Sequence, residues 1–579
     1  MMKSKTFYKK YENILLTSLA VVIFAVFIYT KYDLIYELND DTVIRNLLSG
    51  TYTGIPTAMN NQMMFALSAV ISGLYKIIPA IQWFDIFLII CQYSCVWIVL
   101  KRMMEYCKIT SEKIILVIVY LAFLFTFFLN HFVLLTYTVT SGILAVTAIF
   151  LFITEKNNEN LLIKSIPSIV CAVLAFCIRS ELLLMLFPFI CVAGVYRWSR
   201  EEKIFTTDNL KKYLGVFGVL IVLIAVVFIT DTMAYSSEEW KDFRSFFDAR
   251  TTVYDYTDIP LYKDNEEFYV KEDITYEQFL LLRSYNFGID EEIDSKVMNL
   301  IADYAEKTGV DLKEKINIAL GAYRIQITDK IGTSYHTLVL FGYIILLLSI
   351  NRDNKFKIII TGIFIFFIRS IIWLYLWGQG RVISRITHPL YWGEFVLLLA
   401  IYFYEYKQHG NNEKIKNYIV LCCVMTICFI GFDKEIESFN RAYNREIEET
   451  QLHEYVQKYC LENNDNFYFA STYSIGVFPE KVFDGCSEPS NLEILGGWIT
   501  KSPSHVEKMH LFGINSIDEA LLEKDNVYII QHNDYVSYDT EYPFQWLTSY
   551  YKGKGYNVEV IKTDVIVDNI EVYKVEKVN

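Results

Sequence analysis

Proline and glycine are scarce in this chain. Only 10 prolines and 25 glycines occur among 579 residues, so turns and helix breaks are few and long continuous elements are expected. The sequence also lacks repeats of solenoid period and tracts of low complexity, which argues against repeat proteins and disordered chains. A surplus of basic residues is missing too. The net charge of −13 argues against nucleic acid as a partner.

Cysteine spacing gives no metal motif. Cys91, Cys95, Cys422 and Cys423 belong to apolar runs, where helix packing is the expected role. Cys460 and Cys486 lie in the last polar segment and could form a disulfide, a pairing that spacing alone leaves open. No small-residue cleavage site follows the first apolar run, so we expect this run to stay as a membrane helix.

Long apolar runs dominate what remains. Hydrophobic residues make up 53% of the chain and aromatic residues 16%. Runs of about 18–23 apolar residues are long enough to cross a bilayer. Eleven such runs are predicted as spans: about 12–31, 82–102, 112–130, 133–153, 161–178, 182–198, 213–230, 333–350, 357–377, 388–405 and 417–432. The predicted fold class is therefore a polytopic α-helical membrane protein.

Basic residues beside the runs predict the orientation. The N-terminus carries Lys3, Lys5, Lys9 and Lys10, which favours the cytoplasm under the positive-inside rule. With eleven spans, the short loops 103–111, 154–160, 199–212, 351–356 and 406–416 also become cytoplasmic, and they hold most of the other flanking lysines and arginines. We expect a multi-pass plasma-membrane protein whose C-terminal domain is extracytoplasmic.

One apolar segment needs a separate interpretation. Counting residues 61–80 as a span would move most loop lysines to the outside. The segment is amphipathic, because Met63, Leu67 and Leu74 form one stripe while Ser68 and Ser72 form another. We therefore expect a helix lying in the outer interface. Residues 32–81 then form one exofacial loop with helices at about 42–49 and 61–78.

Two large polar parts are predicted on the same side. Residues 231–332 have helical periodicity and form an insert within a transmembrane domain of residues 1–432. Residues 433–579 begin with a charged helix and continue with strand-like runs at 467–470, 527–530, 558–561 and 570–575. This segment is long enough for an α/β domain with its own core.

An acidic pair follows the first span. Asp40 and Asp41 suit a general base, or a divalent cation such as Mg²⁺ or Mn²⁺ that prefers oxygen ligands. The same residues also suit the N-terminus of a helix beginning near Thr42. The pair alone does not distinguish a reaction centre from a helix cap.

Basic side chains are expected on the same face. Arg179 and Glu181 interrupt the stretch 161–198 at a tight turn, and Arg381 and Arg385 lie in another turn, four residues apart. Arginine forks suit phosphate oxygens. The alternatives are a hairpin whose charged ends reach the interface and ordinary anchoring to lipid headgroups.

Three other ionisable groups could line the same cavity or serve packing. His131 lies in a short turn, His388 precedes Pro389, and Asp85 lies just inside the second span. His388 also suits a helix-entry position and Asp85 a cap. Arg369 and Glu394 lie at similar depths in adjacent spans, so we expect them to neutralise each other.

The pattern resembles the GT-C superfamily of membrane glycosyltransferases. The similarity lies in a first span that ends in an acidic pair, two juxtamembrane helices, many spans and an exofacial C-terminal domain. Two local runs resemble a bacterial branch of this superfamily: Asn39-Asp40-Asp41 … Ser49-Gly50-Thr51-Tyr52-Thr53-Gly54, and Phe243-Arg244-Ser245-Phe246-Phe247-Asp248-Ala249-Arg250-Thr251. The insert at 231–332 is larger than in the simpler members.

The resemblance implies transfer of a sugar from a polyprenyl-phosphate donor to a surface glycan, lipid or protein. It implies Asp40 or Asp41 as the base, with Arg179, Arg381 and Arg385 on the donor phosphate, and it leaves metal dependence open. From the residue pattern itself, Glu181, His388, His131 and Asp85 are candidates to line the same cavity. Alternative functions are a polymerase of lipid-linked repeat units, a transporter or flippase, and an adhesion protein. A transporter should show broken helices near the midplane and internal symmetry, which the sequence lacks.

Overall fold

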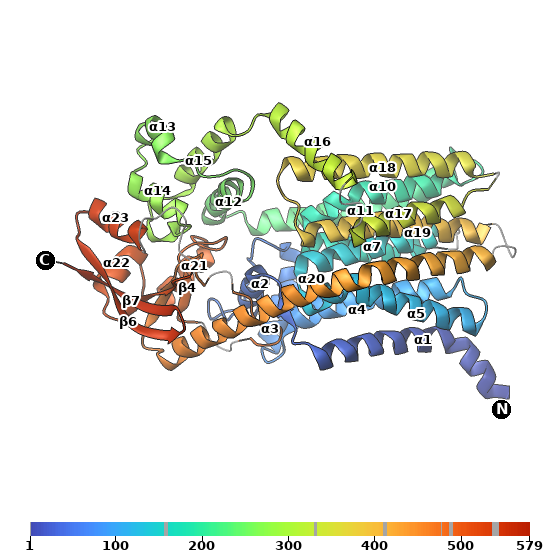
Figure 1. The fold of residues 1–579 in the computed structure, drawn as a ribbon, viewed down its shortest axis with the longest axis horizontal. Helices are drawn as coiled ribbons and strands as arrows, with labels where there is room; N and C mark the ends of the chain where they lie inside the picture. The colour runs from blue at the N-terminus through green and yellow to red at the C-terminus, as the bar shows by residue number, and fades with distance from the viewer. Residues whose placement is uncertain are drawn as a thin grey trace.

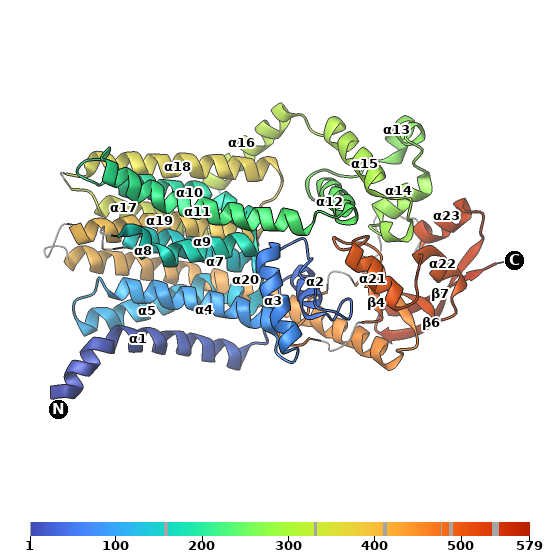
Figure 2. The same ribbon diagram turned by 180° about the vertical axis from the view of Figure 1, so that it is seen from behind.

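The architecture is a helical bundle joined end to end with a soluble lobe (Figures 1 and 2). It is a computed structural model that describes residues 2–155, 160–328, 333–351, 353–408, 414–475, 478–485, 490–534 and 544–578. The N-terminus lies at the end of the bundle far from the lobe, and the C-terminus lies in the lobe. Cys486 falls outside the described residues, so its pairing with Cys460 stays untested.

Each of the eleven predicted runs lies on a bundle helix. The bundle helices are α1 (Met2–Lys31), α4 (Trp83–Met104), α5 (Thr110–Phe127), α7 (Tyr137–Thr154), α9 (Ile166–Ile178), α10 (Ser180–Ser199), α11 (Thr207–Ala234), α17 (Ser334–Leu348), α18 (Lys355–Gly378), α19 (Ser384–Gln408) and α20 (Lys414–Glu462). The short helices α6 (Leu129–Val133) and α8 (Leu161–Lys164) lie between them.

Eight helices of the described chain are long and apolar enough to cross a membrane. The chain is therefore a helical membrane protein, with fewer clear spans than the eleven expected. Two of the remaining runs form shorter apolar helices, α9 with 13 residues and α17 with 15. At 1.5 Å per residue these are about 20 and 23 Å long, short of the hydrocarbon thickness of about 30 Å.

The segment predicted to lie at the interface forms α3 (Phe65–Ile77). Figure 2 shows α3 across the lobe-facing end of the bundle, beside α2 (Asn39–Ser49). Strand β1 (Ile35–Tyr36) precedes α2 and pairs in parallel with β2 (Leu134–Leu135). This two-residue pairing, which the sequence analysis missed, anchors the first loop to the entry of α7.

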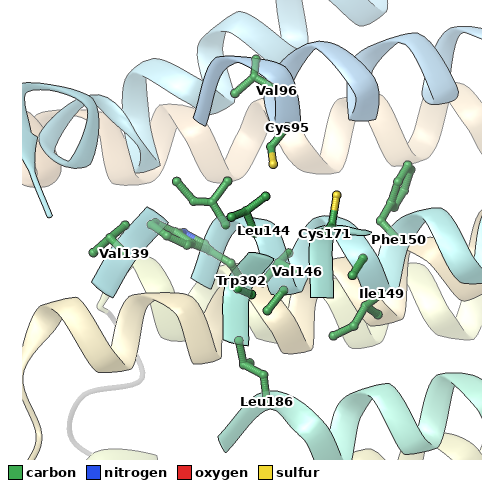
Figure 3. Packing of buried hydrophobic residues seen from close by; sticks show 14 of the residues in the cluster. Cys95, Val96, Val139, Leu144, Val146, Ile149, Phe150, Cys171, Leu186 and Trp392 are labelled. Carbon is green, nitrogen blue, oxygen red and sulfur yellow. The ribbon is translucent and has the colours of Figure 1, made fainter. Parts of the chain in front are cut away.

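The core of the bundle surrounds α7, in which every residue is buried. It packs against α4, α9, α10 and α19. Figure 3 shows side chains of α7 among Cys95 of α4, Cys171 of α9, Leu186 of α10 and Trp392 of α19. Gly142 allows α19 to approach α7 closely, because a Cβ there would lie 2.6 Å from the Cβ of Pro389. Total burial explains why the sequence of α7 shows no polar face.

The insert is helical, as expected, and it packs on the C-terminal domain. Its elements are α12 (Glu238–Thr251), the π-helix η1 (Thr252–Tyr256), η2 (Tyr262–Asp264), α13 (Glu266–Lys271), α14 (Tyr276–Arg283), η3 (Phe287–Ile289), α15 (Ser295–Thr308) and α16 (Leu312–Thr328). Phe246, Phe287 and Leu281 share one hydrophobic cluster with Phe469 and Ile529 of the C-terminal domain. One of the two hydrophobic clusters of the lobe is therefore shared by the insert and the C-terminal domain, and the other is formed by residues of the C-terminal domain alone.

The C-terminal domain is the expected α/β unit. Its sheet has the order β4-β3-β5-β7-β6, with β3 (Phe467–Ala470) parallel to both β4 (Leu492–Ile494) and β5 (Val527–His532). Strands β7 (Ile570–Lys577) and β6 (Val558–Val567) are antiparallel. The other helices are α21 (Pro503–Leu511), α22 (Ile517–Glu523) and α23 (Gln545–Gly553). Four of the five strands were predicted; the three-residue β4 was missed.

Alternation along β3 explains how both faces of the sheet are covered. Phe467 and Phe469 point into the cluster shared with the insert, whereas Tyr468 and Ala470 point to the opposite cluster with Val456 of α20. Helix α20 has 49 residues, about 74 Å at 1.5 Å per residue. It leaves the bundle and covers the second face of the sheet (Figure 1), which joins the lobe to the membrane domain.

Candidate functional site

Asp41 occupies the first turn of α2 and is fully buried. Its Oδ1 accepts the backbone N–H of Tyr137, the first residue of α7, at 2.7 Å. Burial raises the pKa of the Asp41 carboxyl well above its usual value, although the Tyr137 N–H opposes this. Oδ2 is buried with no hydrogen-bond partner. Asp41 therefore fixes α2 to the N-terminus of α7.

Asp40 differs from its neighbour in exposure. It is half-buried, and it lies close enough to Arg179 and Arg250 to interact electrostatically with both guanidinium groups. The first turn of a helix also favours a carboxylate, because the unpaired N–H groups there carry partial positive charge. Of the acidic pair, Asp40 has both the exposure and the cationic neighbours that a reaction centre needs.

Arg179 lies at the junction of α9 and α10, as the tight turn predicted. Its Nη1 donates to the hydroxyl of Tyr137 at 2.6 Å and to the side-chain oxygen of Gln62. Its Nε lies 3.1 Å from Glu181, whose side chain is 66% exposed. These contacts fix the guanidinium beside Asp40, and Glu181 forms part of its support.

The insert supplies Arg250, an arginine that the sequence analysis did not assign to the site. Arg250, at the end of α12, shares Asp255 with Arg381: the nearest N–O distances are 3.9 and 3.4 Å. The hydroxyl of Tyr285 also accepts from Arg250, and the ring of Tyr256 lies 5.5 Å from the Arg381 guanidinium. Arg250 belongs to the run 243–251 that resembles the glycosyltransferase branch. Only the packing of the insert brings it close to Asp40.

Arg385 lies in the first turn of α19 and interacts electrostatically with Glu37 and Asp41. Its side chain makes no hydrogen bond to another residue of the described chain, so its fork can take a ligand. Glu37 has one buried oxygen, Oε2, without a hydrogen-bond partner. Burial raises the pKa of Glu37 to about 7, and Arg385 opposes this shift. Glu37 is a further site residue that the sequence analysis did not single out.

Three of the predicted cavity-lining residues have other contacts. Asp85 is fully buried and holds the Tyr36 hydroxyl and the Phe483 backbone N–H, at 2.8 Å for the latter. It thus fastens the start of α4 to β1 and the C-terminal domain. His131 and His388 share a hydrogen bond of 2.8 Å. Burial lowers the pKa of His131 to about 3, which keeps it neutral within the packing.

The ion pair predicted inside the bundle is present. Arg369 Nε lies 2.9 Å from Glu394, and their side chains are 3% and 1% exposed. Tyr343 also donates to Glu394, and Arg369 contacts His336. The pair is neutralised inside the protein and stands apart from the Asp40 cluster.

Among the described residues, no three side chains of histidine, cysteine, aspartate and glutamate converge as metal ligands would. The nearest charged partners of Asp40 are Arg179 and Arg250. Mg²⁺ is commonly held by one or two carboxylates together with substrate phosphates, so a divalent cation at Asp40 and Asp41 stays a prediction.

Comparisons with known proteins do not assign the chain to a family. No family model, no curated protein and no solved structure matches this chain.

Proposed function

We propose that the protein is a glycosyltransferase that moves a sugar from a polyprenyl-phosphate donor to an acceptor hydroxyl at the outer membrane face. The observation that supports this most is the cluster around Asp40. One half-buried carboxylate interacts with Arg179 at the α9–α10 junction and with Arg250 of α12. Arg381 shares Asp255 with Arg250, and Arg385 of α19 interacts with the neighbouring Asp41.

In the proposed reaction, the carboxylate of Asp40 and the arginine side chains have different roles. Asp40 accepts the proton of the acceptor hydroxyl. The acceptor oxygen forms a bond to the anomeric carbon, and the bond from that carbon to the phosphate oxygen breaks. The phosphate leaves with the electron pair of that bond, and Arg179 and Arg385 stabilise its charge through charge-assisted hydrogen bonds. Arg381 and Arg250 complete the positive field.

An apolar cavity supports a lipid-linked donor. The cavity has a volume of about 130 Å³ and lies within the bundle among α4, α5, α7, α19 and α20. Trp392 and Phe395 of α19 line it, and Arg385 precedes Trp392 by seven residues, about 10 Å along the helix. An isoprenoid chain in this cavity would place its phosphate end toward Arg385.

Asp40→Asn and Asp41→Asn distinguish the two carboxylates. Asparagine at position 41 still accepts the Tyr137 N–H, so Asp41→Asn should fold and retain activity within about tenfold. Asp40→Asn removes the base and should lower transfer by about 10²- to 10⁴-fold. The measurement is the glycan profile of a deletion strain complemented with each variant, with protein amount in the membrane as control. Unchanged glycan with Asp40→Asn would show that Asp40 is not the base.

A further inference from the structure

A second cavity, of about 260 Å³, lies in the lobe where the insert meets the C-terminal domain. Helices α12 and α21 contact each other here, and α15 packs on α12. The cavity is separate from the Asp40 cluster. Its lining comes from α12, the segment 288–295 and residues 501–517.

The unpaired ring nitrogen of His505 indicates that a ligand binds in this cavity. The residue lines the cavity and is only 4% exposed. Its backbone N–H donates to the Oγ of Ser502, the N-cap of α21, whereas its ring Nε2 is buried with no hydrogen-bond partner. A buried polar atom without a partner destabilises a fold. A ligand hydroxyl that donates to or accepts from Nε2 would satisfy it.

The rest of the lining combines acceptors, donors and an apolar wall. Asp242, Glu291 and Asp294 supply carboxylate oxygens, and Lys501 supplies an ammonium group. Asp242 already accepts from Ser295, and Lys501 already donates to the carbonyl of Asp290, so each has further capacity. The apolar wall is formed by Phe243, Phe246, Val506, Met509, Ile514 and Ile517.

This combination selects the class of ligand. Three carboxylates beside one lysine disfavour an anion. Convergent acceptors and donors over an apolar wall suit a neutral molecule with several hydroxyl groups and an apolar face. A sugar ring has both. We infer that this cavity binds a neutral sugar unit of the acceptor, which makes the acceptor a glycan.

Helix α12 connects this cavity to the catalytic cluster. Asp242 lines the cavity, and Arg250, eight residues further along the same helix, lies beside Asp40. The separation is about 12 Å along the axis. A glycan held in the cavity can extend along α12 toward Asp40. The acceptor role rests on the proposed function, whereas sugar binding itself does not.

Saturation-transfer difference NMR on the full chain in detergent tests the binding. The probes are glucose, N-acetylglucosamine and rhamnose, with glucose 1-phosphate as the charged comparison. At least one neutral sugar should show saturation transfer with the wild type. Val506→Trp, which fills the mouth from a 44% exposed position, and Asp242→Ala should each lower that signal at least fivefold. Glu239→Gln, an exposed carboxylate on α12 outside the cavity, should leave it unchanged.

The inference fails if no neutral sugar gives a signal, if glucose 1-phosphate alone binds, or if Val506→Trp and Asp242→Ala bind like the wild type. Asp40→Asn separates this result from the proposed function. Loss of transfer with retained sugar binding in Asp40→Asn supports both ideas. Retained transfer in Asp40→Asn overturns the base assignment while the cavity result stands.

Discussion

Glu37 is the residue through which pH should act on this site. Burial raises its pKa from 4.5 to about 7, and Arg385 opposes the shift, with Glu446 and Arg445 nearby. A carboxyl group whose pKa is raised by folding binds more protons in the folded state. Its contribution to stability is therefore full below about pH 4.5 and is lost as pH rises through about 7.

Glu37→Gln should remove this pH dependence. The melting temperature of the variant relative to the wild type should increase between pH 5 and pH 8, because glutamine stays neutral throughout. Thermal unfolding in detergent across that range measures it. Glu448→Gln, an exposed residue on α20, serves as the control with no such trend. A constant difference across the range for Glu37→Gln would contradict the buried, titrating carboxyl.

Most of the site residues could be predicted from the sequence, but the role of each residue could not. Asp40 and Asp41 are adjacent and chemically identical, so only burial and the Tyr137 N–H separate them. Arg250 was missed because its arrival beside Asp40 depends on how the insert packs. Asp85 was assigned to a cavity, since no local pattern reveals its bonds to Tyr36 and Phe483.

At the scale of elements, one buried ion pair joins α2 to the C-terminal domain. Arg45 Nη2 lies 2.5 Å from Glu480, and the side chains are 1% and 10% exposed. His453 and Gln457 of α20 also contact Glu480. The pair therefore holds α2, the helix that carries Asp40, to α20 and to the segment around Glu480.

Breaking this pair from one side should be costly. Arg45→Met leaves Glu480 buried without its partner and should destabilise the fold by about 3–5 kcal/mol. Arg45→Met/Glu480→Leu should cost less than the sum of the two single changes. The exposed α20 pair Arg441–Glu437 is the matched control, with coupling of about 0.5 kcal/mol or less. Denaturant unfolding of the wild type, single and double variants measures both cycles. Strict additivity at Arg45 and Glu480 would contradict direct coupling.

The hydrophobic periodicity of the sequence predicted which helices and strands form better than it predicted where each one begins and ends. The alternating run at 570–575 became β7, and the apolar runs became bundle helices. The bounds moved where tertiary contacts intervened: α2 begins at Asn39, ahead of the expected 42, because Asp41 bonds the entry of α7. Short pairings such as β1–β2 have only two residues each, too few to leave a pattern.

At the scale of the whole molecule, the N-terminus and the polar parts of the chain lie at opposite ends. Both large polar parts lie in the lobe, the N-terminus lies at the far end, and α3 lies across the lobe end without crossing the bundle (Figures 1 and 2). Which end faces the cytoplasm still rests on the lysines and arginines of the short loops.

Cysteine labelling in intact cells tests that orientation. Glu239 is exposed on α12 in the lobe, and Lys203 is exposed in the connection from α10 to α11 at the opposite end. A membrane-impermeant maleimide should label Glu239→Cys above the background of the native cysteines, and it should label Lys203→Cys only after permeabilisation. Charge bias acts during insertion, so the lysine-rich end stays inside. The reverse labelling would place Asp40 in the cytoplasm, where an externally delivered polyprenyl-phosphate sugar could not reach it.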